Sequence, residues 1–243
     1  MVPTRSDLAS SAPDEAPGAD RLAEPAARPS SPRRYRRVTC LTPWGEREEQ
    51  DGELALRMAT TRDGETAWGF GAHPSSSLAI SVLLGLYQDG APNPQRVLDV
   101  GCGAGVLSIC CARMGAREVR GIDINPAAPR VAALNAADNG AGSCQFDTTP
   151  LAGIVGCYDL VIANLPSPEI QIELSGHLAA RARGGLLITS GYISTHAAKI
   201  EQAYAALEMR FLYSAELTDT DGKEWSASLF KSRGLAGPSR PLP

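Results

Sequence analysis

The sequence predicts an α/β fold, a Rossmann-like, mostly parallel sheet of seven strands with helices on both faces. Three observations support this class. Strand and helix patterns alternate regularly from Val97 onward, and a strand runs directly into a glycine-rich turn that opens a helix. The last two strands follow one another with only residues 217–224 between them, which predicts an antiparallel hairpin at the end of the sheet.

The rest of the predicted fold is arranged around the glycine-rich turn. An apolar strand, residues 97–100, ends at three glycines on alternate positions, Gly101, Gly103 and Gly105, and a helix-forming segment starts at Val106. Glycine suits so sharp a turn, and it lets a ligand approach the backbone. The start of the helix adds unpaired N–H groups, which favour an anionic or polar ligand.

The predicted elements follow one another in a simple order. Strands are expected near residues 97–100, 118–123, 144–147, 158–163, 186–190, 210–216 and 225–231. Helices are expected near residues 75–86, 106–114, 126–139, 170–183 and 195–207. Ser75, Ser76 or Ser77 is available as the N-cap of the first helix.

The N-terminal third predicts less regular structure. Residues 1–32 are rich in Ala, Pro and Ser and lack apolar periodicity, so we expect a disordered tail. Residues 33–67 predict a β-rich lead-in, in which residues 38–41 and 53–58 form a hairpin-like pair. The main domain is expected over residues 68–233, followed by a C-terminal tail over residues 234–243.

Composition narrows the class of protein. The 243 residues, 43% hydrophobic, allow one domain with a full core plus a tail, and the net charge of −4 gives no sign of a nucleic-acid partner. No run is long enough to span a membrane and no signal peptide is evident, so we expect a cytoplasmic protein. The six cysteines lack metal-ligand spacing and there are three histidines, so we expect reduced thiols and no metal.

The spacing of the glycines discriminates between two classes of ligand. Dinucleotide-binding folds use G-x-G-x-x-G, whereas Val106 stands where that third glycine would be. The turn, preceded by Asp99, instead resembles the loop of class I S-adenosylmethionine (SAM)-dependent methyltransferases. Asp123 ends the next predicted strand, about twenty residues later, where a carboxylate can accept the ribose hydroxyls.

A wider set of motifs resembles one branch of these enzymes, the PrmA-type methyltransferases of a ribosomal protein. The resemblance covers about residues 68–231. It depends on the segments at residues 68–78, 99–107, 121–126, 163–165, 184–187, 190–193 and 224–225. It implies SAM as cofactor, contacted by Ser76, Gly101, Asp123 and Asn164. By analogy with class I enzymes in general, Asp99, Gly103 and Gly105 belong to the same site, and Asp147 is a partner for the adenine amino group.

Methyl transfer to an amine requires an aligned, neutral acceptor. Asn164 is expected to orient that amine, and His73, Glu169, Tyr192 and Glu224 are further candidates for a catalytic role. Each of these four has a purely structural alternative, as a hydrogen-bonding loop histidine, a surface acid or a packed aromatic ring.

The leading hypothesis is therefore a SAM-dependent methyltransferase that methylates an amino group of a protein, a peptide or an amine metabolite. Three alternatives stay open from the sequence. They are a natural-product O- or C-methyltransferase, a nicotinamide-dependent oxidoreductase and a SAM-binding module without catalysis.

Overall fold

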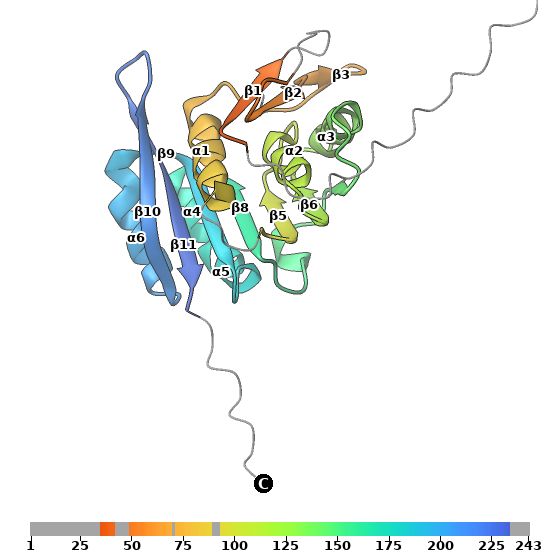
Figure 1. Cartoon of the computed structure of the whole chain (residues 1–243). Helices are drawn as coiled ribbons and strands as arrows, with labels where there is room; N and C mark the ends of the chain where they lie inside the picture. The colour runs from red at the N-terminus through yellow and green to blue at the C-terminus, as the bar shows by residue number, and fades with distance from the viewer. Residues whose placement is uncertain (1–34, 42–48, 70, 89–92, 234–243) are drawn as a thin grey trace, which may run out of the picture.

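The computed structural model describes residues 35–41, 49–69, 71–88 and 93–233, and its centre is a seven-stranded sheet (Figure 1). The strand order is β10-β11-β9-β8-β5-β6-β7. The strands are β5 (Arg96–Val100), β6 (Glu118–Ile122), β7 (Cys144–Asp147), β8 (Leu160–Asn164), β9 (Leu186–Ile193), β10 (Met209–Thr218) and β11 (Glu224–Ser232). Strands β5 to β9 pair in parallel, and β11 is antiparallel to both β9 and β10. The predicted sheet and its C-terminal hairpin are confirmed. The predicted tails lie outside the described residues.

Helices cover both faces of the sheet. They are α1 (Pro74–Gln88), α2 (Val106–Arg113), α3 (Ala127–Asp138), α4 (Pro168–Glu173), α5 (Ser175–Arg181) and α6 (Ala197–Ala205), with 3₁₀ turns at Leu151–Gly153 and Ser194–His196. The predicted single helix over residues 170–183 is wrong, because α4 and α5 meet at Leu174. Helix α4 also begins earlier, at Pro168, since proline suits the first helical position and the Ser167 hydroxyl caps the N–H of Ile170.

Two hydrophobic clusters hold the layers together, one on each face. On β5, Val97 belongs to the cluster shared with α1, α2 and α3, whereas Leu98 belongs to the cluster that includes residues of α5 and α6. Successive side chains of a strand point to opposite faces, so a strand covered on both sides is apolar throughout. This explains why the central strand reads as a continuous apolar run interrupted only by Asp99.

The lead-in differs from its prediction. Strands β1 (Arg37–Leu41) and β2 (Glu53–Arg57) pair in parallel, so the predicted hairpin between them is wrong; the small hairpin is formed by β3 (Thr61–Arg62) and β4 (Glu65–Thr66). The register keeps each β1 residue opposite the residue 16 positions later. The lead-in strands lie at the top of Figure 1, opposite the end at which β11 finishes.

Two asparagines, one on α3 and one at its C-cap, attach this lead-in to the main sheet. Asn139 accepts from the N–H of Arg57 at 2.8 Å and donates to its carbonyl at 2.6 Å. Asn135 makes the same two bonds to Ala59, at 3.1 and 2.8 Å. The backbone just after β2 is thus held by side-chain amides in the way that a neighbouring strand would hold it.

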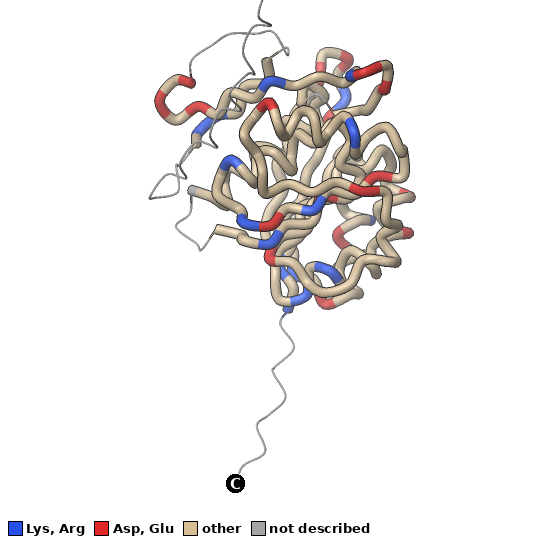
Figure 2. The backbone as a smooth tube through the Cα atoms, turned by 90° about the vertical axis from the view of Figure 1, so that its right-hand side faces the viewer, with Lys and Arg blue, Asp and Glu red and all other residues tan. Residues whose placement is uncertain are grey.

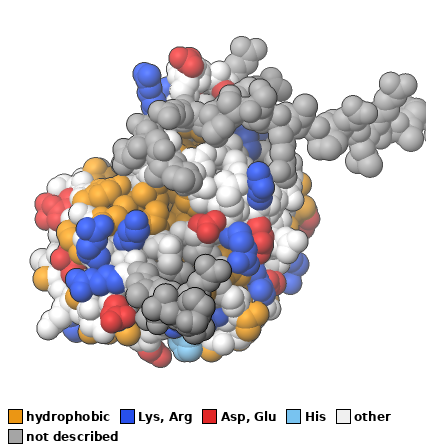
Figure 3. Space-filling model, turned by 60° about the horizontal axis from the view of Figure 1, so that its bottom comes forward, with side chains coloured by type: hydrophobic (Ala, Val, Ile, Leu, Met, Phe, Trp, Pro, Cys, Tyr) orange, Lys and Arg blue, Asp and Glu red, His pale blue; other side chains and the backbone are white. Residues whose placement is uncertain are grey.

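Charges of both signs are distributed over the described chain. Figure 2 shows Lys and Arg interspersed with Asp and Glu along the tube, and both signs occur on the face in Figure 3. Within the described ranges, no helix has the length and apolar character needed to cross a bilayer.

Candidate functional site

The glycine turn lies at the carboxyl end of β5, as predicted. Gly101, Gly103 and Gly105 all have positive φ, of 74°, 53° and 88°. The turn bends toward β6, because the N–H groups of Gly101 and Cys102 both donate to the carbonyl of Ile122. At Gly103 the space is closed as well: a Cβ would lie 2.2 Å from the carbonyl oxygen of Trp68. Only glycine fits this position, because a side chain would displace the lead-in backbone.

Asp123 follows β6 and is attached directly to this turn. Its Oδ2 accepts from the N–H of Gly103 at 2.9 Å, and its Oδ1 accepts from the N–H of Asn125 at 2.8 Å. Both oxygens of a carboxylate can accept a second hydrogen bond. The side chain is partly exposed, so an external hydroxyl can reach it.

Asp99 lies in β5 before the glycine turn, as predicted, but its side chain is buried. It is 1% exposed, and its Oδ2 accepts from the N–H of Ser108 at 3.1 Å and from the Ser108 hydroxyl at 2.6 Å. Burial raises the pKa of Asp99 to about 6, against the opposing effect of the two bonds from Ser108. Asp99 therefore supports the start of α2 from behind the turn, which corrects the prediction that it contacts a ligand.

Ser76 and Asn164 are brought together from segments 88 residues apart. The Nδ2 of Asn164, at the end of β8, donates to the Oγ of Ser76, in the first turn of α1, at 3.1 Å. Leu165, the next residue after Asn164, would lie 2.7 Å from a Cβ on Gly101. The Ser76–Asn164 pair thus borders the glycine turn on the β8 side, while Asp123 borders it on the β6 side.

His73 precedes α1 and contacts the start of β11. Its Nδ1 lies 2.8 Å from the Oγ of Ser75 and accepts from the N–H of Ser75 at 3.3 Å, so His73 takes the capping position expected for a serine. The His73 and Trp225 rings meet edge to face at 4.6 Å. Trp225 in turn donates to Asp219 at 2.8 Å. These contacts place His73 beside the β10–β11 hairpin.

Glu224 and Glu169 are both exposed, but on different segments. Glu224, the first residue of β11, accepts from the hydroxyl of Ser194 at 2.6 Å. Glu169 lies in the first turn of α4, where its own backbone N–H and the Ser167 hydroxyl lower the pKa of its carboxyl group. Hydrogen bonds that stabilise the ionised form have this effect.

Tyr192 and Asp147 are occupied by partners inside the protein. Tyr192 is 1% exposed, and its hydroxyl lies 3.1 Å from Thr189 and donates to Ser228 at 2.9 Å. This core position corrects its prediction as a catalytic residue. At Asp147, burial works to raise the pKa, but hydrogen bonds from Arg120 and Thr149 hold it below the ordinary value. The Asp147 carboxylate is paired with Arg120 at 2.8 Å.

Two buried amides at this site were missed from the sequence. Asn135 also donates to the carbonyl of Ala104 in the glycine turn, at 2.9 Å. Gln171, on α4, donates to the carbonyl groups of Ala163 and Ser190, where the pairing of β8 with β9 ends. The signal available for Asn135 is its spacing of four residues from the apolar Val131, which puts a polar side chain on the buried face of α3.

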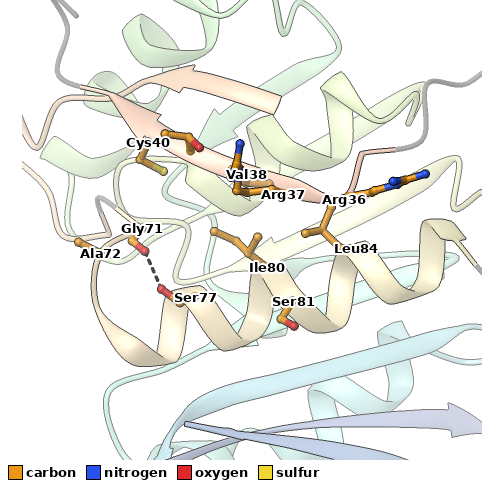
Figure 4. A pocket seen from close by; sticks show the side chains of 11 residues that line it. Arg36, Arg37, Val38, Cys40, Gly71, Ala72, Ser77, Ile80, Ser81 and Leu84 are labelled. Atoms are coloured by element: carbon orange, nitrogen blue, oxygen red, sulfur yellow. Dashed lines mark hydrogen bonds between the residues drawn. The ribbon is translucent and has the colours of Figure 1, made fainter. Parts of the chain in front are cut away.

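A separate hollow lies on the outer side of the loop before α1. It has a volume of about 450 Å³ and lies between β1 and α1, with Arg36, Cys40, Gly71, Ile80 and Leu84 among its lining residues (Figure 4). Ser77 donates to the carbonyl of Gly71 across its wall. Asp123 and Asn164 do not line it, so this hollow is distinct from the site around the glycine turn.

Known proteins resemble this chain over most of its length. The family model described as ribosomal protein L11 methyltransferase (PrmA) matches residues 31–232. A ribosomal protein L11 methyltransferase of Geobacter sp. strain M21 is 36% identical over 200 residues, covering 81% of this chain and 61% of the relative. That of Geobacter sulfurreducens is 34% identical over 205 residues, covering 84% and 63%. The chain thus spans about three fifths of the length of these curated relatives.

Solved structures place the fold in the same group. The ribosomal protein L11 methylase of Lactobacillus delbrueckii subsp. bulgaricus superposes with a TM-score of 0.67 at 26% identity, covering 81% of this chain and 95% of that one. Magnesium protoporphyrin IX methyltransferase of Synechocystis PCC 6803, solved with bound SAM, superposes with a TM-score of 0.56 at 27% identity, covering 63% of this chain and 78% of that one. The predicted class I methyltransferase fold is confirmed, and the chain belongs to the family of ribosomal protein L11 methyltransferases (PrmA).

Proposed function

We propose that this chain is a SAM-dependent methyltransferase that transfers a methyl group to an amino nitrogen of a protein acceptor. The observation that carries the proposal is the arrangement around the glycine turn, with the Asp123 carboxylate on one side and the Ser76–Asn164 pair on the other. Family membership supports it, and the names of the relatives make ribosomal protein L11 the first acceptor to test.

The residues present fit SAM. Gly103 lets the lead-in backbone close over the turn, because a Cβ there would lie 2.2 Å from the carbonyl oxygen of Trp68. Asp123 has spare acceptor capacity for ribose hydroxyls, and the Ser76 hydroxyl, held by the Asn164 amide, can bind the amino-acid end of the cofactor. When bound, SAM supplies an activated methyl group on a sulfonium centre.

The contribution of the protein is alignment of the acceptor. Because the Nδ2 of Asn164 is directed to Ser76, the amide oxygen of Asn164 is the atom that can accept from an incoming amine. Accepting an N–H bond directs the nitrogen lone pair away from Asn164, and proximity and orientation of this kind lower a barrier by several kcal/mol, up to ~10. His73 and Glu224 are the candidate residues for taking the proton released from the amine.

Titration calorimetry with SAM and with its demethylated product tests the cofactor. We expect micromolar binding of both and no binding of NAD. Asp123→Ala should weaken SAM binding at least 100-fold, because the ribose loses its acceptor and Gly103 N–H loses its partner. Asp138→Ala is the control. It removes a carboxylate of α3 that is paired with Arg62, and its affinity for SAM should equal that of wild type. Unchanged affinity of Asp123→Ala would show that the ribose site is wrong.

Incubation with radiolabelled SAM tests the acceptor. Ribosomal protein L11 and a small-molecule extract are offered separately, and products are identified by mass. Label on lysine or N-terminal amino groups of the protein supports the proposal. Label found only on an amine metabolite, or on an oxygen or carbon atom, would show that the acceptor is not a protein amine and would overturn this part of the proposal.

A further inference from the structure

A fully buried glutamine bonds two central strands where their pairing ends. The Nε2 of Gln171 donates to the carbonyl of Ala163 at 2.7 Å and to the carbonyl of Ser190 at 2.8 Å. Ala163 directly precedes Asn164 on β8, and Ser190 is the residue opposite Asn164 on β9. One side-chain amide therefore holds a backbone carbonyl group of each strand at the last residue pair between β8 and β9.

The same strand pair is also bonded to α1. The Oγ of Ser190 donates to the carbonyl of Ser75 at 2.9 Å, and the Nδ2 of Asn164 donates to the Oγ of Ser76 at 3.1 Å. The N–H of Leu165 donates to the carbonyl of Ser190 at 3.1 Å. A shift of the Gln171 bonds would thus move both β8 and β9 at the point where they carry Asn164 and contact α1.

Only the amino end of the Gln171 amide is bonded within the described chain. The Oε1 of Gln171 is buried and has no hydrogen-bond partner within the part of the chain that the structure describes. A buried acceptor without a partner is unfavourable, and methionine would fill a similar volume without one. The two donated bonds are therefore the property that glutamine adds.

We infer that Gln171 is a positioning residue that holds the Asn164 amide in the orientation that meets the acceptor amine. This inference rests on the proposed function, because it assigns Asn164 to the acceptor. Gln171 itself is covered by protein and acts on the reaction only through the last residues of the β8–β9 pairing.

Kinetics of Gln171→Met in the whole 243-residue chain test the inference. We expect kcat to fall at least 10-fold, while the Kd for SAM stays within threefold of wild type. The unfolding temperature should fall by no more than it does in Asn139→Leu, which also loses two bonds to the backbone. Gln171→Glu, which keeps the shape but in its ionised form offers no donor, should lose kcat at least as strongly. A role that is only structural would lower the unfolding temperature and leave kcat unchanged.

A double-mutant cycle with Asn164→Ala tests whether Gln171 acts through Asn164. If it does, the double variant with Gln171→Met is no slower than Asn164→Ala alone. Asn139→Leu is the matched control, since it removes another buried amide, one that holds the backbone of Arg57 on β2 instead. It should lower the unfolding temperature, leave kcat within twofold and combine additively with Asn164→Ala.

The outcomes separate the two claims. Wild-type protein that methylates no amine overturns the proposed function, and this inference with it. Wild-type turnover that Gln171→Met leaves within twofold, or losses that multiply in the double variant, would overturn the inference alone.

Discussion

At the scale of single residues, the Asp99 carboxyl group is buried, and only one of its two oxygens has a hydrogen-bond partner in the described chain. Its Oδ2 is bonded to Ser108, whereas its Oδ1 is buried without a partner in the described chain. In the ionised form such a group is costly, because it has lost its hydration and gained only two bonds in return. The residue nevertheless connects β5 to the first turn of α2, on which the glycine turn depends.

A pH dependence of stability follows from this burial. Because the pKa of Asp99 rises from 3.8 to about 6 on folding, the folded protein keeps its proton to higher pH than the unfolded chain does. The free energy of unfolding therefore falls as the pH rises from about 4 to 6, by up to about 3 kcal/mol from this group. Asp99→Asn should remove that component, as measured by the difference between variant and wild type in urea unfolding at pH 4 and pH 7. An unchanged pH slope in the variant would contradict the assignment.

Two glycines with positive φ allow backbone strain to be separated from steric exclusion. Gly115, after α2, has a φ of 108° with open space around it, so Gly115→Ala should cost only about 1–2 kcal/mol of unfolding free energy. Gly103→Ala adds a contact of 2.2 Å with Trp68, and should both destabilise more and weaken SAM binding at least 10-fold. Urea unfolding and calorimetry measure the two effects. Equal behaviour of the two variants would mean that the turn does not approach the lead-in so closely.

At the scale of elements, α3 determines how the lead-in meets the glycine turn. Asn135 is fully buried and bonds the N–H and carbonyl of Ala59 and the carbonyl of Ala104. The N–H of Ala104 donates to the carbonyl of Trp68 at 2.6 Å, so both polar groups of this turn residue are bonded outside the turn. The conformation of the turn thus depends on two segments far from it in sequence.

Asn135→Leu should expose this dependence. It leaves three buried backbone groups without their partner, which predicts a loss of about 2–4 kcal/mol of unfolding free energy. SAM affinity should fall as well, because Ala104 is no longer held. Asn139→Leu is the comparison, since it also breaks bonds to the lead-in but none to the turn; it should be destabilised with normal SAM affinity. Denaturant unfolding and calorimetry on both variants decide the point.

At the scale of the whole molecule, the lead-in strands and the main sheet share one core. Leu54 and Leu56 of β2, together with Met58, are fully buried in the cluster that α1 and α2 form against the sheet. Burying one such side chain stabilises a protein by about 1.5–3 kcal/mol, so the three together approach the net stability of an ordinary domain.

Removal of this segment should therefore prevent folding. A chain that begins at residue 60 is expected to show no cooperative thermal transition and no fixed near-ultraviolet circular dichroism. A chain shortened by residues 1–32, which the sequence predicts to be disordered, is the control and should keep the wild-type unfolding temperature. A cooperative transition in the shorter chain would show that the sheet forms a core without β2.

The sequence by itself determined the features that depend on local pattern. Alternating strands and helices predicted the sheet, and the spacing of three glycines with Asp123 twenty residues beyond predicted the turn and its carboxylate. Asn164 and Ser76 were identified through the family resemblance. Period and spacing are properties of a short stretch of chain, and tertiary contacts did not override them here.

Only the tertiary structure decided the features that depend on a distant partner. Whether β1 and β2 pair in parallel depends on the path of the chain between them, and whether Asp99 or Tyr192 faces a ligand depends on what packs over it. Gln171 and Asn135 are ordinary polar helix residues until the fold brings backbone carbonyl groups against them, in the case of Asn135 and Ala59 across 76 residues of sequence. Hydrogen bonds and burial each depend on two groups that meet in space. The sequence shows that a residue can form a hydrogen bond, but not which group will be its partner.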